Sequence, residues 1–256
     1  MAKQRIVVKV GTHVLTKSTG ELDKPIFRQL VVQLVKLVEL GWQPVLVSSG
    51  AVGAGKSIIG ELAIEDEAVR RQVWSSIGQA SLMKRYFELF QEYDLICAQV
   101  LATKDDFSEG EHYQNMLNCF EGLLAQGIIP IVNENDVVSL TELMFTDNDE
   151  LAGLTAKMIK ANKLLILSNI DGFYTGLPED EASELISEVP FDTDQFDGYV
   201  QSSKASNGRG GMASKYKVVK GVAAQGIEAH IANGKLENVM VAIATGEDIG
   251  TKFLAK

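Results

Sequence analysis

Short runs of apolar, β-branched residues alternate along this chain with longer segments that have the 3.6-residue period of an amphipathic helix. This alternation is typical of a largely parallel sheet that is covered by helices on both faces. The apolar runs predict strands at 5–10, 43–48, 94–101, 128–132, 163–168 and 228–232. We therefore expect an α/β protein, a three-layer αβα sandwich with a largely parallel open sheet.

The helix between the first two predicted strands has the clearest signals. Pro25 suits its first turn, Leu30, Leu34 and Leu37 line one face, and Gly41 ends it. The same pattern predicts further helices near 67–92, 112–126, 149–161, 211–225 and 235–242.

Two segments interrupt this rhythm. Residues 136–148 are predicted to form a polar hairpin or loop, and residues 171–210 form a long excursion rich in acidic residues, serine and glycine. Because no linker or internal repeat divides the chain, we expect one domain over residues 1–256, with two lobes at approximately 1–160 and 161–256.

Composition and charge exclude several classes of partner. The net charge is −10, and no run of Lys or Arg could follow a phosphate backbone, so nucleic acid is not expected as a partner. The N-terminus alternates charged and apolar residues, and no apolar run is long enough to cross a bilayer, so we expect a cytoplasmic protein without a membrane partner.

Cysteines and histidines give no sign of a metal centre. Cys97 and Cys119 lie singly in apolar surroundings and are predicted to be buried free thiols. His13, His112 and His230 lack the spacing of metal ligands or of a catalytic triad, and surface or packing roles are expected for them. No metal ligand from the protein is predicted.

The residues that follow each predicted strand are the candidates for a site, because ligands of open α/β sheets bind beyond the carboxyl ends of the strands. In KVGTHVLT, residues 9–16, Lys9 near a strand end can direct its ammonium group at a phosphate. Gly11 and Thr12 begin the turn, where backbone N–H groups can approach the same anion. A strand-end lysine that only extends toward solvent remains the alternative.

The segment SSGAVGAGKS, residues 48–57, offers a competing interpretation. From Gly50 to Ser57 it matches the G-x-x-x-x-G-K-[ST] pattern of phosphate-binding loops. However, it follows the second strand rather than the first, and the later strand ends in Ser168 and Asn169 rather than in a magnesium-binding Asp.

Three further motifs follow strands or open helices. NENDVVS, residues 133–139, and FTDNDELAG, residues 145–153, cluster Asn and Asp side chains that can accept hydrogen bonds from an ammonium group. Turn formation and helix capping are the alternative uses of such residues. GRGGMASK, residues 208–215, is a glycine loop that enters a helix, and it could hold the terminal phosphates of a nucleotide.

These motifs, in this order and over essentially the whole chain, resemble the amino acid kinase family, and within it the members that phosphorylate glutamate. The resemblance implies the amino acid kinase fold, with ATP and Mg²⁺ as cofactors and glutamate and ATP as substrates. It implies transfer of the γ-phosphate of ATP to the side-chain carboxylate of glutamate, the first step of proline biosynthesis. In the family, the position that matches Lys56 is also occupied by arginine, so the phosphate-loop match is interpreted as incidental.

The resemblance also implies roles for individual residues. Lys9 and Lys215 would contact the phosphoryl group and Asp149 would orient both lysines. Glutamate would be bound by Ser49, Gly50, Ala51, Asp136 and Asn148. ATP would be bound by Lys9, Gly11, Thr12, Ser168, Asn169, Arg209, Gly210, Gly211, Met212, Ala213, Ser214 and Lys215. Magnesium would be carried by the nucleotide phosphates.

This chemistry agrees with the absence of a catalytic histidine motif. A glutamate side chain, with a pKa of about 4.3, is already ionised at neutral pH, so the nucleophile needs no general base. The reaction does need positive charge around the transferred phosphoryl group, which Lys9, Lys215 and magnesium could supply. The excursion at 171–210 is a candidate lid that excludes water.

The chain departs from the family pattern at several points. Asn169 stands where an Asp is common, His13 stands where a small hydroxyl residue is usual, and the chain ends at Lys256 without a C-terminal PUA domain. The resemblance further implies a homo-oligomer, dimer or tetramer, and proline as a feedback inhibitor. Open alternatives are an acetylglutamate, aspartate, carbamate or uridylate kinase of the same family, and a non-catalytic amino acid sensor with the same fold.

Overall fold

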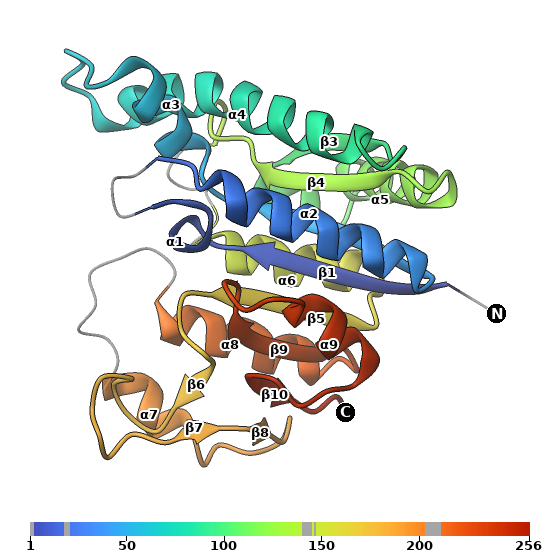
Figure 1. Ribbon diagram of the computed structural model, residues 1–256, viewed down its shortest axis with the longest axis vertical. Coiled ribbons are helices and arrows are strands. Elements are labelled where there is room, and N and C mark those ends of the chain that lie inside the picture. Colours follow the sequence, from blue (N-terminus) through green and yellow to red (C-terminus); the bar gives the residue numbers. More distant parts are fainter. Residues whose placement is uncertain (1–2, 18–20, 140–144, 146, 203–210) are drawn as a thin grey trace.

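The computed structural model describes residues 3–17, 21–139, 145, 147–202 and 211–256. Its centre is an eight-stranded sheet in the order β3-β4-β2-β1-β5-β9-β10-β8 (Figure 1). The strands are β1 (Gln4–Val10), β2 (Trp42–Ser48), β3 (Cys97–Ala102), β4 (Ile129–Glu134), β5 (Lys163–Ser168), β8 (Glu188–Val189), β9 (Glu228–Asn233) and β10 (Thr251–Phe253). The β3-β4-β2-β1-β5-β9 pairs are all parallel and β10 runs antiparallel to β9, which confirms the predicted largely parallel α/β sheet.

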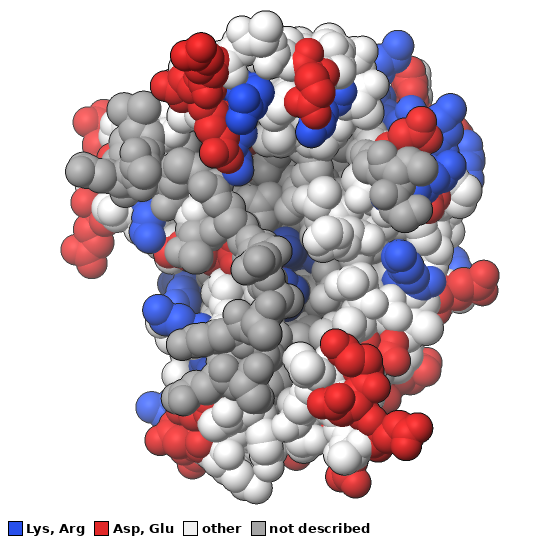
Figure 2. All heavy atoms as spheres, turned by 90° about the vertical axis from the view of Figure 1, so that its left-hand side faces the viewer, with Lys and Arg blue, Asp and Glu red and all other residues white. Residues whose placement is uncertain are grey.

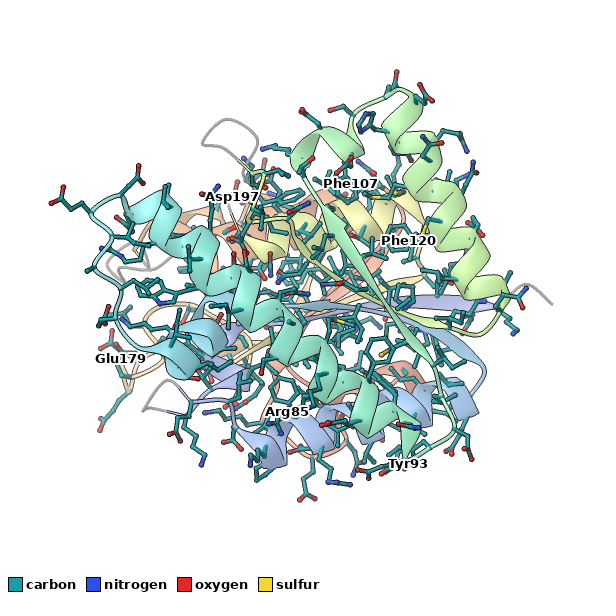
Figure 3. The ribbon with its side chains drawn as sticks, turned by 90° about the horizontal axis from the view of Figure 1, so that it is seen from above. Arg85, Tyr93, Phe107, Phe120, Glu179 and Asp197 are labelled. Carbon is teal, nitrogen blue, oxygen red and sulfur yellow. The ribbon has the colours of Figure 1, made fainter. Side chains whose placement is uncertain are left out.

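Helices cover both faces of this sheet, as predicted (Figure 1). The first face packs against α2 (Lys24–Glu39), α4 (Glu67–Gln91) and α9 (Val239–Thr245). The second packs against α5 (Glu111–Ala125), α6 (Asn148–Met158) and α8 (Met212–Ala223). In Figure 3, α4 runs diagonally across the molecule, with Arg85 and Tyr93 toward its C-terminal end, and Phe120 marks α5 in the opposite layer.

Strand β1 shows how the sequence divides its side chains between the two helical layers. Successive side chains of a strand point to opposite faces of the sheet. Val8 and Val10 pack in the core of the α2 and α4 layer, whereas Val7 packs in the core of the α6 and α8 layer. Lys9 shares the alternation of Val7, so its side chain is directed to the layer that contains α6.

Most predicted element boundaries agree with the structure, and two that differ have a backbone cause. The third strand begins at Cys97 rather than at residue 94, because Asp94 has a positive φ of 55° in the turn after α4. The last predicted helix begins at Val239 rather than at residue 235, because Asn238, with φ 58°, precedes it. Left-handed backbone at a non-glycine residue interrupts a regular element.

The excursion after β5 has more structure than its composition suggested. Its described part contains β6 (Phe173–Tyr174), β7 (Leu185–Ile186), β8 and α7 (Asp197–Ser202). Phe173, Ile186 and Val189 are buried in the core of the second layer. Residues 203–210, and residues 140–144 and 146 of the predicted polar loop, lie outside the described part of the chain.

Helix α3 (Ala51–Ile59), which the hydrophobic pattern did not predict, crosses α4 in direct backbone contact. A Cβ atom added at Gly55 would lie 1.8 Å from the carbonyl oxygen of Trp74. A Cβ atom at Gly78 would lie 1.8 Å from the carbonyl oxygen of Ala51. Because no side chain fits at either glycine, the sequence brings these helices closer than ordinary side-chain packing allows.

Smaller elements complete the chain. They are α1 (Thr12–Leu15) and the 3₁₀ helix η1 (Lys104–Phe107).

Cys97 is buried as predicted, but the prediction for Cys119 is wrong, because it lies on the exposed side of α5. Among the described residues, no helix combines the length and apolar character that a membrane crossing requires.

Candidate active site

A cavity of about 680 Å³ lies at the carboxyl ends of β1, β2, β4 and β5. Figure 2 shows the face that carries these strand ends, with basic side chains in the depression at its middle and acidic side chains toward its upper and lower margins. Many of the predicted site residues line the cavity: Lys9, Gly11, Thr12, Ser49, Gly50, Ala51, Asp136, Asn148, Ser168, Asn169, Gly211, Met212 and Lys215.

Three predicted catalytic residues form one buried cluster. The Lys9 Nζ lies 2.7 Å from Asp149 Oδ1, and the Lys215 Nζ lies 3.0 Å from Asp149 Oδ2. The Asp149 side chain is 0% exposed, and the side chains of Lys9 and Lys215 are 6% and 10% exposed. One carboxylate therefore holds two ammonium groups, which come from opposite ends of the sequence, against the same side of the cavity.

Local sequence explains how these three side chains meet. The Asp147 carboxylate caps α6 by accepting hydrogen bonds from the backbone N–H groups of Asp149 (2.9 Å) and Glu150 (3.0 Å). This cap starts the helix so that Asp149, in the first turn, faces the Lys9 side of β1. Lys215 is placed in the first turn of α8, where its N–H donates to the carbonyl oxygen of Gly211 (3.3 Å).

The cluster carries a net positive charge, since two ammonium groups surround one carboxylate. Buried charges of this kind act with less screening than surface charges, so an anion in the cavity is attracted strongly. Gly11 keeps the approach to Lys9 open, because a Cβ atom at Gly11 would lie 3.4 Å from the Lys9 Nζ and 3.7 Å from the Leu167 carbonyl oxygen. The arrangement suits a phosphoryl group.

A polar wall lies beside this cluster at the ends of β2 and β4. Asn148 Nδ2 donates hydrogen bonds to Ser49 Oγ (2.9 Å) and to Asn133 Oδ1 (2.9 Å). Asp136 lies farther along the same wall, with its Oδ1 3.7 Å from a guanidinium nitrogen of Arg71. Amide, hydroxyl and carboxylate groups therefore converge where the sequence predicted the acceptor substrate.

Glu134 is a half-buried acid in this wall. Burial raises the pKa of its carboxyl group, and a hydrogen bond from the backbone N–H of Phe145 to Glu134 Oε1 (3.1 Å) acts in the opposite direction. The nearby Asp136 carboxylate also raises the pKa of Glu134. The wall thus collects negative charge that an ammonium group of a ligand could balance.

The opposite side of the cavity is formed by the end of β5 and by the excursion. The backbone N–H of Gly234 donates to the carbonyl oxygen of Ser168 (2.8 Å), and Asn169 is exposed beside it. Leu177, Pro178 and Glu179 of the excursion also line the cavity, and Figure 3 shows Glu179 at the margin of the molecule. This half of the cavity is lined by a mixture of apolar and polar residues and carries fewer charges than the lysine cluster.

Some predicted site residues are not brought to the cavity. Ala213 and Ser214 lie in the first turn of α8 but are not among the lining residues. Arg209 and Gly210 lie outside the described residues. Lys56, the lysine of the phosphate-loop match, is also absent from the lining.

The geometry of Lys56 gives no support to a phosphate-binding loop. Its half-exposed side chain pairs with Glu61 Oε1 at 2.6 Å, and its Nζ lies 5.2 Å from the centre of the Trp74 ring. Gly50 and Ala51, at the start of the same match, do line the cavity.

Other lining residues were not predicted as site residues. Arg71 reaches the cavity from the second turn of α4, where no motif marks it. Asn133, Glu134 and Asp147 also line the cavity; they lie within the Asn- and Asp-rich motifs, but the motifs predicted no role for these three residues. His13 also lines the cavity, although a surface or packing role was expected.

Comparison with known proteins places the chain in a family. Residues 4–233 match the model of the amino acid kinase family. The chain is similar to the glutamate 5-kinase of Bacteroides thetaiotaomicron, with 47% identity over 98% of this chain and 70% of the relative. It is also similar to the glutamate 5-kinase of Clostridium perfringens, with 39% identity over 99% of this chain and 96% of the relative.

Solved structures agree at the level of the fold. Carbamate kinase from Giardia lamblia bound to AMP-PNP has a TM-score of 0.73 at 15% identity and covers 100% of this chain and 99% of its own. UMP kinase from Ureaplasma parvum has a TM-score of 0.68 at 17% identity and covers 99% of this chain and 100% of its own. Because the family model matches most of the chain and the relatives are up to 47% identical to it, the chain belongs to the amino acid kinase family.

Proposed function

We propose that this protein is a glutamate 5-kinase, which transfers the γ-phosphoryl group of ATP to the side-chain carboxylate of glutamate and yields glutamyl 5-phosphate and ADP, the first step of proline biosynthesis. The buried Lys9–Asp149–Lys215 cluster at the edge of the cavity is the observation that carries the proposal. Curated relatives that span nearly the whole chain and are named glutamate 5-kinase support the choice of acceptor.

In this proposal, glutamate lies on one side of the cavity and ATP on the other, so the glutamate side-chain carboxylate faces the γ-phosphate. An oxygen of the glutamate side-chain carboxylate attacks the γ-phosphorus, a P–O bond forms, and the bond to the β,γ-bridging oxygen breaks, so that ADP leaves with that electron pair. No proton must be removed, because the carboxylate is already ionised at neutral pH.

Lys9 and Lys215 perform the electrostatic part of this reaction. Charge in the transition state is spread over the oxygens of the transferred phosphoryl group. Two desolvated ammonium groups that are already fixed by Asp149 stabilise that charge without having to reorganise. Asp149 acts on the lysines rather than on the substrate, since its side chain is fully buried beneath them.

The walls of the cavity supply the binding roles. Ser49, Gly50, Ala51, Asp136 and Asn148 hold glutamate, and Gly11, Thr12, Ser168, Asn169, Gly211 and Met212 lie on the path of the nucleotide. We keep four more residues in the proposed nucleotide loop: Ala213 and Ser214, which lie between the lining residues Met212 and Lys215, and Arg209 and Gly210, which lie outside the described residues. We assign the glutamate lobe to approximately residues 1–160 and the ATP lobe to 161–256.

Magnesium enters this proposal with the nucleotide, where it screens phosphate charge. Within the described residues, no group of three or more His, Cys, Asp or Glu side chains is placed to hold a metal ion. We propose that the nucleotide phosphates carry the magnesium. A homo-oligomer, dimer or tetramer, and feedback inhibition by proline complete the proposal. Sedimentation analysis and proline titration of the activity test these two points.

Trapping of the acyl phosphate tests the acceptor. Purified protein with ATP, magnesium and hydroxylamine is expected to form the hydroxamate of glutamate and not that of aspartate or N-acetylglutamate. A preference for either alternative acceptor would overturn the substrate assignment. Absence of ATP turnover with each of them would favour a non-catalytic sensor, an outcome that the complete lysine cluster argues against.

A further inference from the structure

The polar wall of the cavity is connected to α4 by a chain of hydrogen bonds. Asn133 Nδ2 donates to Gln79 Oε1 (2.9 Å), and Asn133 Oδ1 accepts from Asn148 Nδ2 (2.9 Å). Asn148 Nδ2 in turn donates to Ser49 Oγ (2.9 Å). The chain therefore runs from the side chain of Gln79, which does not line the cavity, to Ser49 and Asn148, which do.

The direction of this chain is fixed by the backbone. The N–H of Glu134 donates to Asn133 Oδ1 (2.9 Å), and a backbone N–H can only donate. The atom of Asn133 at that place must be its carbonyl oxygen, so the atom that faces Gln79 must be its NH₂ group. Gln79 must therefore accept this hydrogen bond with its side-chain carbonyl oxygen.

The same reasoning extends to the cavity. Since Asn133 presents its oxygen, Asn148 must face it with its NH₂ group. The backbone carbonyl oxygen of Ser48, which can only accept, lies 3.5 Å from the same Asn148 nitrogen and supports this orientation. Both hydrogens of the Asn148 amide are then directed to Asn133 and Ser49. The Asn148 carbonyl oxygen accepts no hydrogen bond from the residues that the structure describes.

Ser49 receives the last hydrogen bond of the chain. Because its Oγ accepts from Asn148, its own hydroxyl hydrogen is available to donate toward the cavity. A hydroxyl donor suits a carboxylate, and an amide carbonyl suits an ammonium group. An α-amino acid carries both groups on one carbon.

We propose that Gln79 is a positioning residue, which holds the Asn133 side chain in place so that Ser49 and Asn148 present their hydrogen-bonding atoms to the α-amino and α-carboxylate groups of the substrate. This inference rests on the proposed function, since it requires an amino acid in the cavity. Asn133 is only 4% exposed, so loss of the Gln79 acceptor leaves a buried NH₂ group without its partner. The Asn133 side chain is then held at its oxygen alone, and the acceptor that Asn148 uses is less firmly placed.

Three variants on one helix test the proposal. Gln79→Met keeps the length of the side chain and removes the acceptor, whereas Gln79→Glu keeps an acceptor oxygen. Gln91→Met makes the same chemical change at an exposed position of α4 and is the matched control. Each protein is assayed for kcat, for KM toward glutamate and toward ATP, and for its melting temperature.

Gln79→Met is expected to raise the KM for glutamate about tenfold, the size of one lost buried hydrogen bond, while the KM for ATP changes less than about twofold. Gln79→Glu is expected to remain within about threefold of the parent for glutamate, and Gln91→Met to equal the parent. A glutamate KM near the parent value in well-folded Gln79→Met, or equal rises for glutamate and ATP, would overturn the proposal. Gln79→Ala serves the same purpose if Gln79→Met does not fold.

A double-mutant comparison tests the route. In an Asn148→Ala background, Gln79→Met should change the glutamate KM by less than about twofold, because the residue through which it acts is gone. A full additional tenfold change there would contradict a route through Asn148. Failure of the proposed function is distinct from either result, since the parent itself would then fail to phosphorylate glutamate.

Discussion

Two carboxylates, one at each end of the strands of the central sheet, are each paired with basic side chains, yet they have different surroundings. Asp149 pairs with Lys9 and Lys215 at the carboxyl ends of the strands. Glu228 pairs with Lys163 and, through Oε1, with His230 Nε2 at 2.8 Å. Lys163 and Glu228 are the first residues of β5 and β9, so this second cluster lies at the amino ends.

The two clusters differ in their contact with solvent and with the cavity. The side chains of Glu228 and Lys163 are 26% and 16% exposed, whereas that of Asp149 is 0% exposed. The hydrogen bond from His230 and the charge of Lys163 hold the pKa of Glu228 at about 2. Lys9 and Lys215 line the cavity, whereas Lys163, Glu228 and His230 do not. We therefore assign catalysis to the cluster around Asp149 and stability to the cluster around Glu228. A charged cluster is therefore assigned by its place in the fold rather than by its composition.

Removal of one ion-paired lysine from each cluster should give the largest contrast. Lys215→Ala is expected to lower kcat about 10³-fold, because the phosphoryl group loses a fixed cation in a site of low screening. Lys163→Ala removes a comparable ion-paired lysine from the other cluster and should leave kcat within about twofold of the parent. ADP release under saturating substrates measures both, and similar losses would contradict the functional division.

Neutralisation of each carboxylate should give the next largest difference in kcat between the two clusters. Asp149→Asn preserves the shape of the side chain but leaves two ammonium groups without their counter-ion, so we expect kcat to fall about 10²-fold. Glu228→Gln should retain nearly full kcat in the same assay. Full activity of Asp149→Asn would contradict the role of Asp149 in holding Lys9 and Lys215.

The pH dependence of stability should reveal the Glu228 cluster. The folded-state pKa of Glu228, about 2, lies below its ordinary value of 4.5, so its stabilisation is present above pH 4.5 and is lost as the pH falls toward about 2. Glu228→Gln is expected to lower the free energy of unfolding by about 1–3 kcal/mol at pH 7, and by less at pH 3. Urea unfolding at a series of pH values measures this difference, and a difference that grows as the pH falls would contradict it.

Lys252→Ala should produce the smallest effect. Its Nζ lies 3.7 Å from Glu228 Oε2, and its side chain is 31% exposed. A partly solvated pair at this distance contributes about 0.2–1 kcal/mol. Urea unfolding at pH 7 should therefore show a much smaller loss than that of Glu228→Gln, and a larger one would change the ranking of contacts within this cluster.

The sequence predicted most of the sheet because its strands are buried runs with clear boundaries. It did not predict α3, whose small residues pack through backbone contact rather than through an apolar stripe. It also missed β10, a three-residue antiparallel strand that is too short to show a period. The local pattern of apolar and polar residues does not predict such elements, because tertiary contacts determine whether they form.

The candidate site was partly predictable for a related reason. Lys9, Asn148 and Lys215 lie in motifs at strand ends or helix starts, where chain direction alone brings them to one edge of the sheet. Arg71 and Gln79 instead belong to the long helix α4, and their relation to the cavity depends on how that helix lies across the sheet. No local signal in the sequence gives that orientation.

The close crossing of α3 and α4 at Gly55 and Gly78 has a mechanical consequence for the glutamate side of the cavity. Peptide groups that touch cannot slide past one another as interlocking side chains can, so the two helices should behave as one stiff body. Ser49 immediately precedes that body, and Gln79 is part of it. If the walls of the cavity approach each other during turnover, we expect the displacement to come from the opposite rim, which carries Leu177 and Met212.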